Sequence, residues 1–186
     1  HRRYFFPLMP GVTHVPYGYC YRCPYKLTFP ECRYWCVDFI DEEVLNKYHP
    51  AENTAAMFIE SVQGEGGYVV PPEDYFHRLK NVLDKNGILF VDDEIQSGMG
   101  RTGKWFAIEH WGLTPDIITM AKALGSGLPI GATVAKEEIM YWEGGSHANT
   151  FGGNPVASAV ALQVIDIIKK ERLLENANKQ GTYLME

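Results

Sequence analysis

One lysine lies where an amine could act as a nucleophile. Lys122 follows the short apolar run 117–120 and leads into the glycine-rich turn 125–127. An amine at a strand end that is partly shielded from water has a lowered pKa and can attack a carbonyl carbon. The small apolar neighbours Ala121 and Ala123 favour this interpretation over that of an ordinary surface lysine.

An acid follows an earlier apolar run. The run 88–91 ends at Asp92 and Asp93, and alternation along a strand points these two side chains to opposite faces. One of them can therefore enter a site while the other has a structural role, although both could simply cap the next turn. A buried carboxylate stabilises a cation such as a protonated pyridine nitrogen. A lysine that forms a Schiff base, together with an acid for a pyridinium, predicts pyridoxal phosphate (PLP) as cofactor.

The composition argues against several kinds of partner. The chain has 186 residues, is 46% hydrophobic and carries a net charge of −6. It contains no dense basic run and no apolar stretch of membrane-spanning length, so we expect neither nucleic acid nor a membrane as partner. No signal peptide is visible, and we expect a cytoplasmic protein. Because the chain opens on His1 and stops inside a helical pattern, we expect a central fragment of a longer protein.

The elements that must position these residues alternate along the chain. Strands are predicted at 54–59, 88–91, 117–120 and 131–135, and helices at 41–48, 72–83 and 155–170. Apolar strands that alternate with helices indicate an α/β fold with a mostly parallel sheet covered by helices. Such sheets bind ligands at the carboxyl ends of their strands. Glu60, Asp93 and Lys122 all lie at or just past such ends.

Two further segments could contact a ligand. The turn 60–67 carries Glu60 and Glu65 among glycines that would let the backbone approach a ligand closely, although a flexible connection is the alternative. Thr150 lies shortly before the helix expected from Pro155, where free N–H groups could hold a phosphate. Asn154 could equally serve there as an N-cap, and both roles are compatible.

Four cysteines lie in an irregular opening segment that is rich in proline and aromatic residues. Their spacing is close to that of a four-thiolate zinc site. One or two disulfides, or free buried thiols, are the alternatives. We predict that no metal binds, because the intervening aromatic side chains give the segment a small core of its own. The four residues are Cys20, Cys23, Cys32 and Cys36.

Taken together, these segments resemble the class III (subgroup III) PLP-dependent aminotransferases, most closely the 4-aminobutyrate and ornithine types. The resemblance implies part of the large domain of a fold type I PLP-dependent transferase. It covers the chain from about residue 55 to the end. Asp93 precedes Lys122 by 29 residues, which is the usual interval in that family. The resemblance depends on four collinear motifs, at 60–67, 93–103, 115–122 and 150–155.

The resemblance implies a role for each matching cofactor residue. Lys122 would hold PLP covalently and move the proton during catalysis, and Asp93 would pair with the pyridinium nitrogen. Ile95 would pack on the ring face, and Gln96 would reach the phenolic oxygen. Thr150 would bind the phosphate of the PLP in the partner subunit, which implies a homodimer with shared active sites.

The resemblance also implies the substrates. Glu60 and Glu65 would belong to the substrate pocket, where Glu65 matches an acid that pairs with a substrate-binding arginine. The reaction would move an amino group from a small amine or amino acid, such as 4-aminobutyrate, to an oxo acid. An amino-acid racemase or epimerase of the same family is one alternative, and an inactive or structural cysteine-rich module is another. Ser61 stands where proline is common, and we expect no consequence.

The resemblance divides the chain into three segments. Residues 1–50 would form an irregular part of the large domain, residues 51–172 its PLP-binding core, and residues 173–186 the start of a C-terminal small domain. The family's phosphate-binding glycine loop and the aromatic residue that stacks on the ring would precede residue 1. The substrate-binding arginine would follow residue 186.

Overall fold

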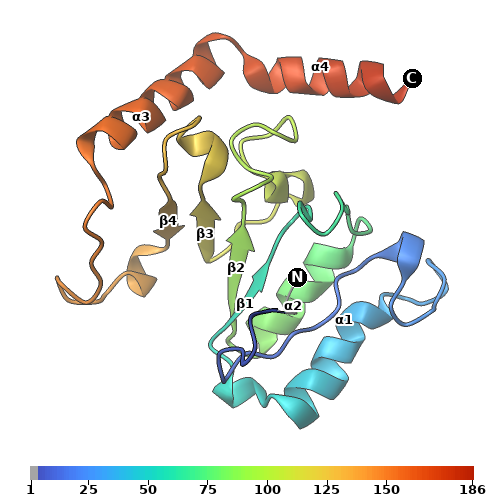
Figure 1. Cartoon of the computed structure of the whole chain (residues 1–186). Helices are drawn as coiled ribbons and strands as arrows, with labels where there is room; N and C mark the ends of the chain where they lie inside the picture. The colour runs from blue at the N-terminus through green and yellow to red at the C-terminus, as the bar shows by residue number, and fades with distance from the viewer. Residues whose placement is uncertain (1–3) are drawn as a thin grey trace.

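The fold is a four-stranded sheet with helices packed around it (Figure 1). The computed structural model describes residues 4–186. The strands are β1 (Ala56–Ile59), β2 (Leu89–Asp93), β3 (Ile117–Met120) and β4 (Ala132–Ala135). The α-helices are α1 (Trp35–Phe39), α2 (Tyr75–Lys85), α3 (Pro155–Lys170) and α4 (Leu173–Met185). π-helical turns, η3 (Ile40–Tyr48), continue α1, and the 3-10 turns are η2 (Cys20–Arg22), η4 (Ala51–Asn53), η5 (Ala107–Trp111), η6 (Lys122–Leu124) and η7 (Glu137–Ile139).

The sheet confirms the predicted fold class. Its strand order is β1-β2-β3-β4, in which β1, β2 and β3 are parallel and β4 is antiparallel to β3. The carboxyl ends of the three parallel strands therefore meet at one edge. In register, Ile59 lies beside Asp92, and Asp93 lies beside Thr119. The predicted strand at 117–120 matches β3, and the others agree to within one or two residues at most ends.

Helix α2 covers one face of β2. Four of its residues are only 1% exposed, namely Tyr75, Phe76, Leu79 and Leu83. The ring of Phe76 stacks on Phe90 in β2, with centroids 6.1 Å apart. Burying a side chain of this size contributes about 1.5–3 kcal/mol relative to leaving it exposed. Successive side chains of a strand point to opposite faces, so Phe90 and Asp92 lie on the face of β2 that α2 covers. Asp93 therefore points to the other face.

Helix α3 packs beside the turn that carries Lys122. It begins at Pro155, as predicted, and the side chain of Asn154 caps it by accepting a hydrogen bond from the Ala157 N–H at 2.9 Å. Its buried residues Ala161 and Ile168 form a cluster with Leu124 of η6. Within residues 4–186, no helix combines the length and apolar composition needed to cross a membrane.

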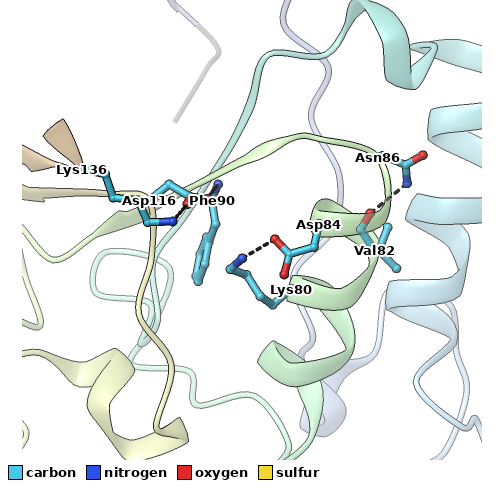
Figure 2. A network of polar contacts seen from close by, with 7 residues as sticks. All are labelled: Lys80, Val82, Asp84, Asn86, Phe90, Asp116 and Lys136. Atoms are coloured by element: carbon cyan, nitrogen blue, oxygen red, sulfur yellow. Dashed lines mark hydrogen bonds and ion pairs between the residues drawn. The ribbon is translucent and has the colours of Figure 1, made fainter. Parts of the chain in front are cut away.

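A buried aspartate ties three strands together (Figure 2). The Asp116 carboxylate accepts a hydrogen bond from the Phe90 N–H at 2.8 Å and forms an ion pair with the Lys136 amine at 2.6 Å. Burial alone would raise the pKa of Asp116. The hydrogen bonds from Lys136 and Phe90 outweigh that effect and lower the pKa. Figure 2 also shows Lys80 paired with Asp84 on the surface of α2.

We expect Asp116→Asn to destabilise the protein in a pH-dependent way. Because the folded carboxyl has the lower pKa, its contribution is present above the unfolded pKa of about 4 and is lost as the pH falls through the folded pKa. Urea unfolding between pH 3 and pH 8 should therefore show the variant and the wild type converging in acid. Asp84→Asn, on the exposed pair, is the control and should cost less than about 1 kcal/mol. If the free energies of unfolding of Asp116→Asn and the wild type differ by the same amount at every pH, the lowered pKa of Asp116 would be contradicted.

Candidate active site

Lys122 occupies a strained turn at the end of β3. Its φ of +41° lies in the left-handed region, which is uncommon for a residue with a side chain. The following turn needs Gly125, because a Cβ atom there would lie 2.0 Å from the Leu128 carbonyl oxygen. The Lys122 side chain is exposed, whereas the sequence led us to expect partial shielding. The turn presents this side chain to solvent, so the described residues do not themselves shield the amine.

The Lys122 amine donates a hydrogen bond to Oε1 of Gln96. Gln96 follows β2, so this contact links the ends of two neighbouring parallel strands. Gly64 lies against the same glutamine, and a Cβ atom at that position would be 2.4 Å from Gln96 Cγ. The turn 60–67 can approach Gln96 only because residue 64 has no side chain. Three of the four sequence motifs therefore meet at one place.

Asp93 is half-buried at the end of β2 and is held through one oxygen. Its Oδ1 accepts hydrogen bonds from the Ile95 N–H at 3.0 Å and the Thr119 hydroxyl at 3.4 Å. Within residues 4–186, both hydrogen bonds to the Asp93 carboxylate are accepted by Oδ1. Its Oδ2 is therefore left to accept a hydrogen bond from the N–H of a ligand. Thr119 was not predicted as a site residue. Its place opposite Asp93 follows from the register of β2 and β3, which the sequence did not reveal.

Asp92 points to the opposite face and is fully buried. Its Oδ1 accepts a hydrogen bond from the Ser61 hydroxyl at 2.6 Å. Ser61 is also fully buried, so this departure from the family pattern adds a buried hydrogen bond to Asp92. A proline there could not donate this hydrogen bond. The combination of a serine and an aspartate at these two positions was the available signal, but it becomes meaningful only once β1 and β2 are known to be neighbours.

The remaining predicted site residues differ in how buried they are. Glu60 turns inward and accepts a hydrogen bond from the Gly64 N–H at 2.7 Å, while its own N–H donates to the Tyr17 hydroxyl at 3.1 Å. Ile95 is half-buried beside Asp93, whereas Glu65 and Thr150 are exposed. The structure thus brings Lys122, Gln96 and the turn 60–67 together but leaves Thr150 in an outward loop.

An open cleft of about 1090 Å³ adjoins Lys122. Its walls come from the turn 121–131, from Arg101 and from the loop around Asn149 and residues 151–154. Lys122 and Arg101 are its two charged lining residues, and glycines contribute bare backbone at 127, 131, 152 and 153. A cleft with two cations and no acid favours an anionic ligand.

The protein-family model described as aminotransferase class-III matches residues 1–186, which is the whole chain. The chain belongs to the class-III aminotransferase family. Among curated relatives, the leucine/methionine racemase of Thermococcus litoralis is 51% identical, over 95% of this chain and 40% of its own length. The ornithine aminotransferase of an Exiguobacterium species is 40% identical, over 100% of this chain and 41% of its own length. The chain thus spans about two-fifths of the curated relatives it matches.

A solved structure supports the same fold. The chain superposes with a TM-score of 0.89 on a thermostable (S)-enantioselective omega-transaminase of Thermomicrobium roseum. The two are 40% identical, and the match covers 98% of this chain and 42% of that one. Class-III aminotransferases share the fold type I architecture of PLP-dependent enzymes, and the mostly parallel sheet described above agrees with it.

The residues present suit PLP. An aldehyde needs an amine, which Lys122 supplies at the rim of a cleft that favours an anion such as a phosphate. A pyridinium needs a carboxylate with a spare oxygen, which Asp93 supplies through Oδ2. Gly64 leaves the space that Gln96 occupies beside the amine. These donors match the cofactor's aldehyde, phosphate and ring nitrogen.

The four cysteines line one small cavity of about 20 Å³ in the opening segment and are free thiols. Burial, followed by the neighbouring Cys32, raises the pKa of Cys36 to about 11. A raised pKa disfavours the thiolate that metals bind. Within residues 4–186, no group of three or more histidine, cysteine or acidic side chains is arranged to hold a metal.

We therefore still predict that purified protein contains no stoichiometric metal. Elemental analysis by mass spectrometry should give well under one zinc per chain, and a thiol assay in denaturant should count four free thiols. A variant with Cys20, Cys23, Cys32 and Cys36 all changed to serine is the control for adventitious metal. One zinc per chain that disappears in this variant would overturn the prediction.

Proposed function

We propose that the protein is a PLP-dependent aminotransferase in which Lys122 and Asp93 act on the cofactor. The observation that carries the proposal is the meeting of the β2 and β3 ends, where Lys122 contacts Gln96 and Asp93 keeps Oδ2 open. An amine and an acid on adjacent parallel strands are what this chemistry requires. We also propose the division into segments 1–50, 51–172 and 173–186; α4 begins at Leu173, where the third segment would start.

Each residue has a defined task in the proposal. When bound, PLP supplies a protonated ring that accepts electron density from the substrate carbon. Asp93 would keep the ring nitrogen protonated through Oδ2, because an adjacent carboxylate raises the pKa of a cationic acid. Lys122 would hold the cofactor covalently and, once displaced by substrate, would take and return the proton at the substrate carbon. Ile95 would pack on the ring face, and Gln96 would orient both the amine and the phenolic oxygen.

We propose an amino donor with a terminal amine, such as 4-aminobutyrate or ornithine, and an oxo acid as acceptor. The 40% identity to an ornithine aminotransferase supports this class. Glu60 and Glu65 would line the donor side of the pocket. Of these two, Glu60 already faces the Gln96 side through its hydrogen bond to Gly64, whereas Glu65 is exposed and free to pair with a substrate-binding arginine.

A racemase is the second candidate function, since the leucine/methionine racemase is 51% identical. The two activities use the same lysine and aspartate and differ in whether the amino group leaves. The full-length protein should be incubated with L-ornithine, 4-aminobutyrate or L-leucine, with and without 2-oxoglutarate. Stoichiometric consumption of the oxo acid supports the aminotransferase. Loss of optical rotation without oxo-acid consumption would identify a racemase instead.

We also propose a homodimer in which Thr150 serves the partner's site. Thr150 is exposed in an outward loop, while its neighbours Asn149 and Phe151 line the cleft. A residue so placed can reach a ligand held by a second copy related by a two-fold axis. In that arrangement each phosphate would contact one Thr150 from the other subunit.

Mixing two impaired variants tests the shared site. Lys122→Ala and Thr150→Ala chains should each form weakly active dimers, but a heterodimer carries both lesions in one site and neither in the other. After random exchange, roughly one quarter of the wild-type sites should be intact, and activity should recover to that level. Mixing each variant with itself is the control. No recovery despite exchange shown by native mass spectrometry would leave Thr150 as a turn residue only.

A further inference from the structure

A buried cluster lies on the face of the sheet opposite to Asp93. Ser61 and Asp92 are 0% exposed, and Glu94 is 1% exposed. Ser61 donates to Oδ1 of Asp92, but Oδ2 of Asp92, equally buried, has no hydrogen-bond partner within residues 4–186. A buried charged oxygen without a donor is strongly unfavourable. The geometry therefore favours a protonated, neutral Asp92.

The neighbouring acid has the opposite environment. Glu94 Oε2 accepts a hydrogen bond from the Ser97 hydroxyl at 2.6 Å, and Oε1 accepts one from the Ile108 N–H at 3.0 Å. Both of its oxygens are thus satisfied as an anion. Of two nearby carboxyls that compete for one proton, the one with more hydrogen-bond donors keeps the negative charge. In this pair that carboxyl is Glu94.

The surroundings of Asp92 do not offset a second charge. Burial raises the pKa of Asp92, the charge of Glu94 raises it further, and the Ser61 hydroxyl lowers it only in part. The nearby titratable groups are Tyr17 from the opening segment, which interacts with Asp92, and its other neighbours Glu60 after β1 and Asp93 on the other face of β2. None of these groups is a cation, and burial raises the pKa of Tyr17.

We propose that Asp92 and Glu94 share one proton, carried by Asp92, and that with Ser61 they form a positioning unit for Asp93. Side chains alternate along a strand, so anchoring Asp92 on one face of β2, and Glu94 directly after the end of the strand, fixes the direction of residue 93 on the other face. The Ser61 hydrogen bond adds the end of β1 to this anchor. The positioning role rests on the proposed function, in which Asp93 meets the ring nitrogen, whereas the shared proton does not depend on it.

The stability of cofactor-free protein tests the shared proton. Asp92→Asn mimics the protonated acid. Its amide oxygen can accept the Ser61 hydrogen bond, and its NH2 group takes the place of the protonated Oδ2. Below pH 4 the two proteins should differ little in their dependence on pH. As the pH rises, the unfolded aspartate ionises while the folded one stays protonated, so the wild type loses stability relative to the variant. The ratio of their folding constants should grow by up to about tenfold per pH unit.

Asp116→Asn is the matched control in the same sheet. Asp116 is also buried but is ion-paired with Lys136, which lowers its pKa, so its pH dependence has the opposite sign. Glu94→Gln removes the neighbouring charge and so lowers the folded pKa of Asp92. The Asp92 slope should still begin near the unfolded pKa but should end at a lower pH. A ratio for Asp92→Asn that is flat from pH 4 to pH 8, or that falls, would overturn the shared proton.

A comparison of two substitutions in the holoenzyme tests the positioning role. Asp92→Ala removes the Ser61 anchor and should lower turnover roughly 10- to 100-fold, the scale of an ångström-level misplacement. Asp92→Asn should restore turnover and the wild-type pH profile of the cofactor's visible absorbance. If Asp92→Ala does not fold, Ser61→Ala takes its place. Equal damage from Ala and Asn, or none from Ala, would overturn the role. Wild-type protein that binds no PLP would instead disprove the proposed function and leave the stability result standing.

Discussion

Lys122→Ala is expected to abolish the covalent attachment of PLP and to lower amino transfer by about 100- to 10,000-fold, the contribution typical of a positioned general base. The physical reason is that Lys122 lines the cleft and is the nucleophile of the proposed site, so its substitution would remove both the covalent bond and the proton carrier. Alanine keeps a Cβ atom, so the cost of the +41° φ is unchanged and the fold should persist. Borohydride reduction followed by peptide mapping gives the attachment site directly.

Lys104→Ala is the control for this experiment, because Lys104 is an exposed lysine outside the cleft lining. It should leave both the reduced adduct and turnover unchanged. An adduct that maps to another lysine, or one that survives in Lys122→Ala, would show that Lys122 is not the nucleophile. Restoration of slow turnover by an added primary amine would further support the role of Lys122 in proton transfer.

Asp93→Asn should retain PLP but lose most activity. Asparagine can still accept the hydrogen bonds from Ile95 and Thr119, so the local structure should survive. A neutral amide cannot hold the ring nitrogen protonated, and loss of one such electrostatic contact typically costs about 100- to 1,000-fold in kcat. The measurements are kcat, the affinity for PLP and the pH dependence of the cofactor's absorbance.

Asp92→Asn is the matched control for Asp93→Asn, since the two residues are adjacent on β2 and face opposite ways. The position 92 variant should stay close to wild-type turnover. Near-normal turnover in Asp93→Asn together with a large loss in Asp92→Asn would exchange the two roles. This pair of variants therefore tests both the site assignment and the positioning unit.

The alternation of apolar runs and helices was sufficient to predict most of the fold. Helix α3 and strand β3 have the bounds expected from the sequence, because Asn154-Pro155 is a strong helix start and 117–120 is a short run before a turn. Strand direction was less accessible. The antiparallel pairing of β4 with β3 depends on tertiary contacts, since a four-residue strand carries no signal of its direction.

By itself, the sequence determined the chemistry, because residue type fixes what a side chain can do: an amine at 122 and carboxylates at 92 and 93 follow apolar runs at the interval of a known family. Strand alternation alone could not choose between the two aspartates, and the resemblance favoured Asp93. Tertiary structure gives them different surroundings, since only the pairing of β1 with β2 places Ser61 against Asp92 and only the register with β3 places Thr119 against Asp93. These contacts join residues 31 and 26 positions apart along the chain, and such distances are closed by packing of the whole sheet, not by local sequence.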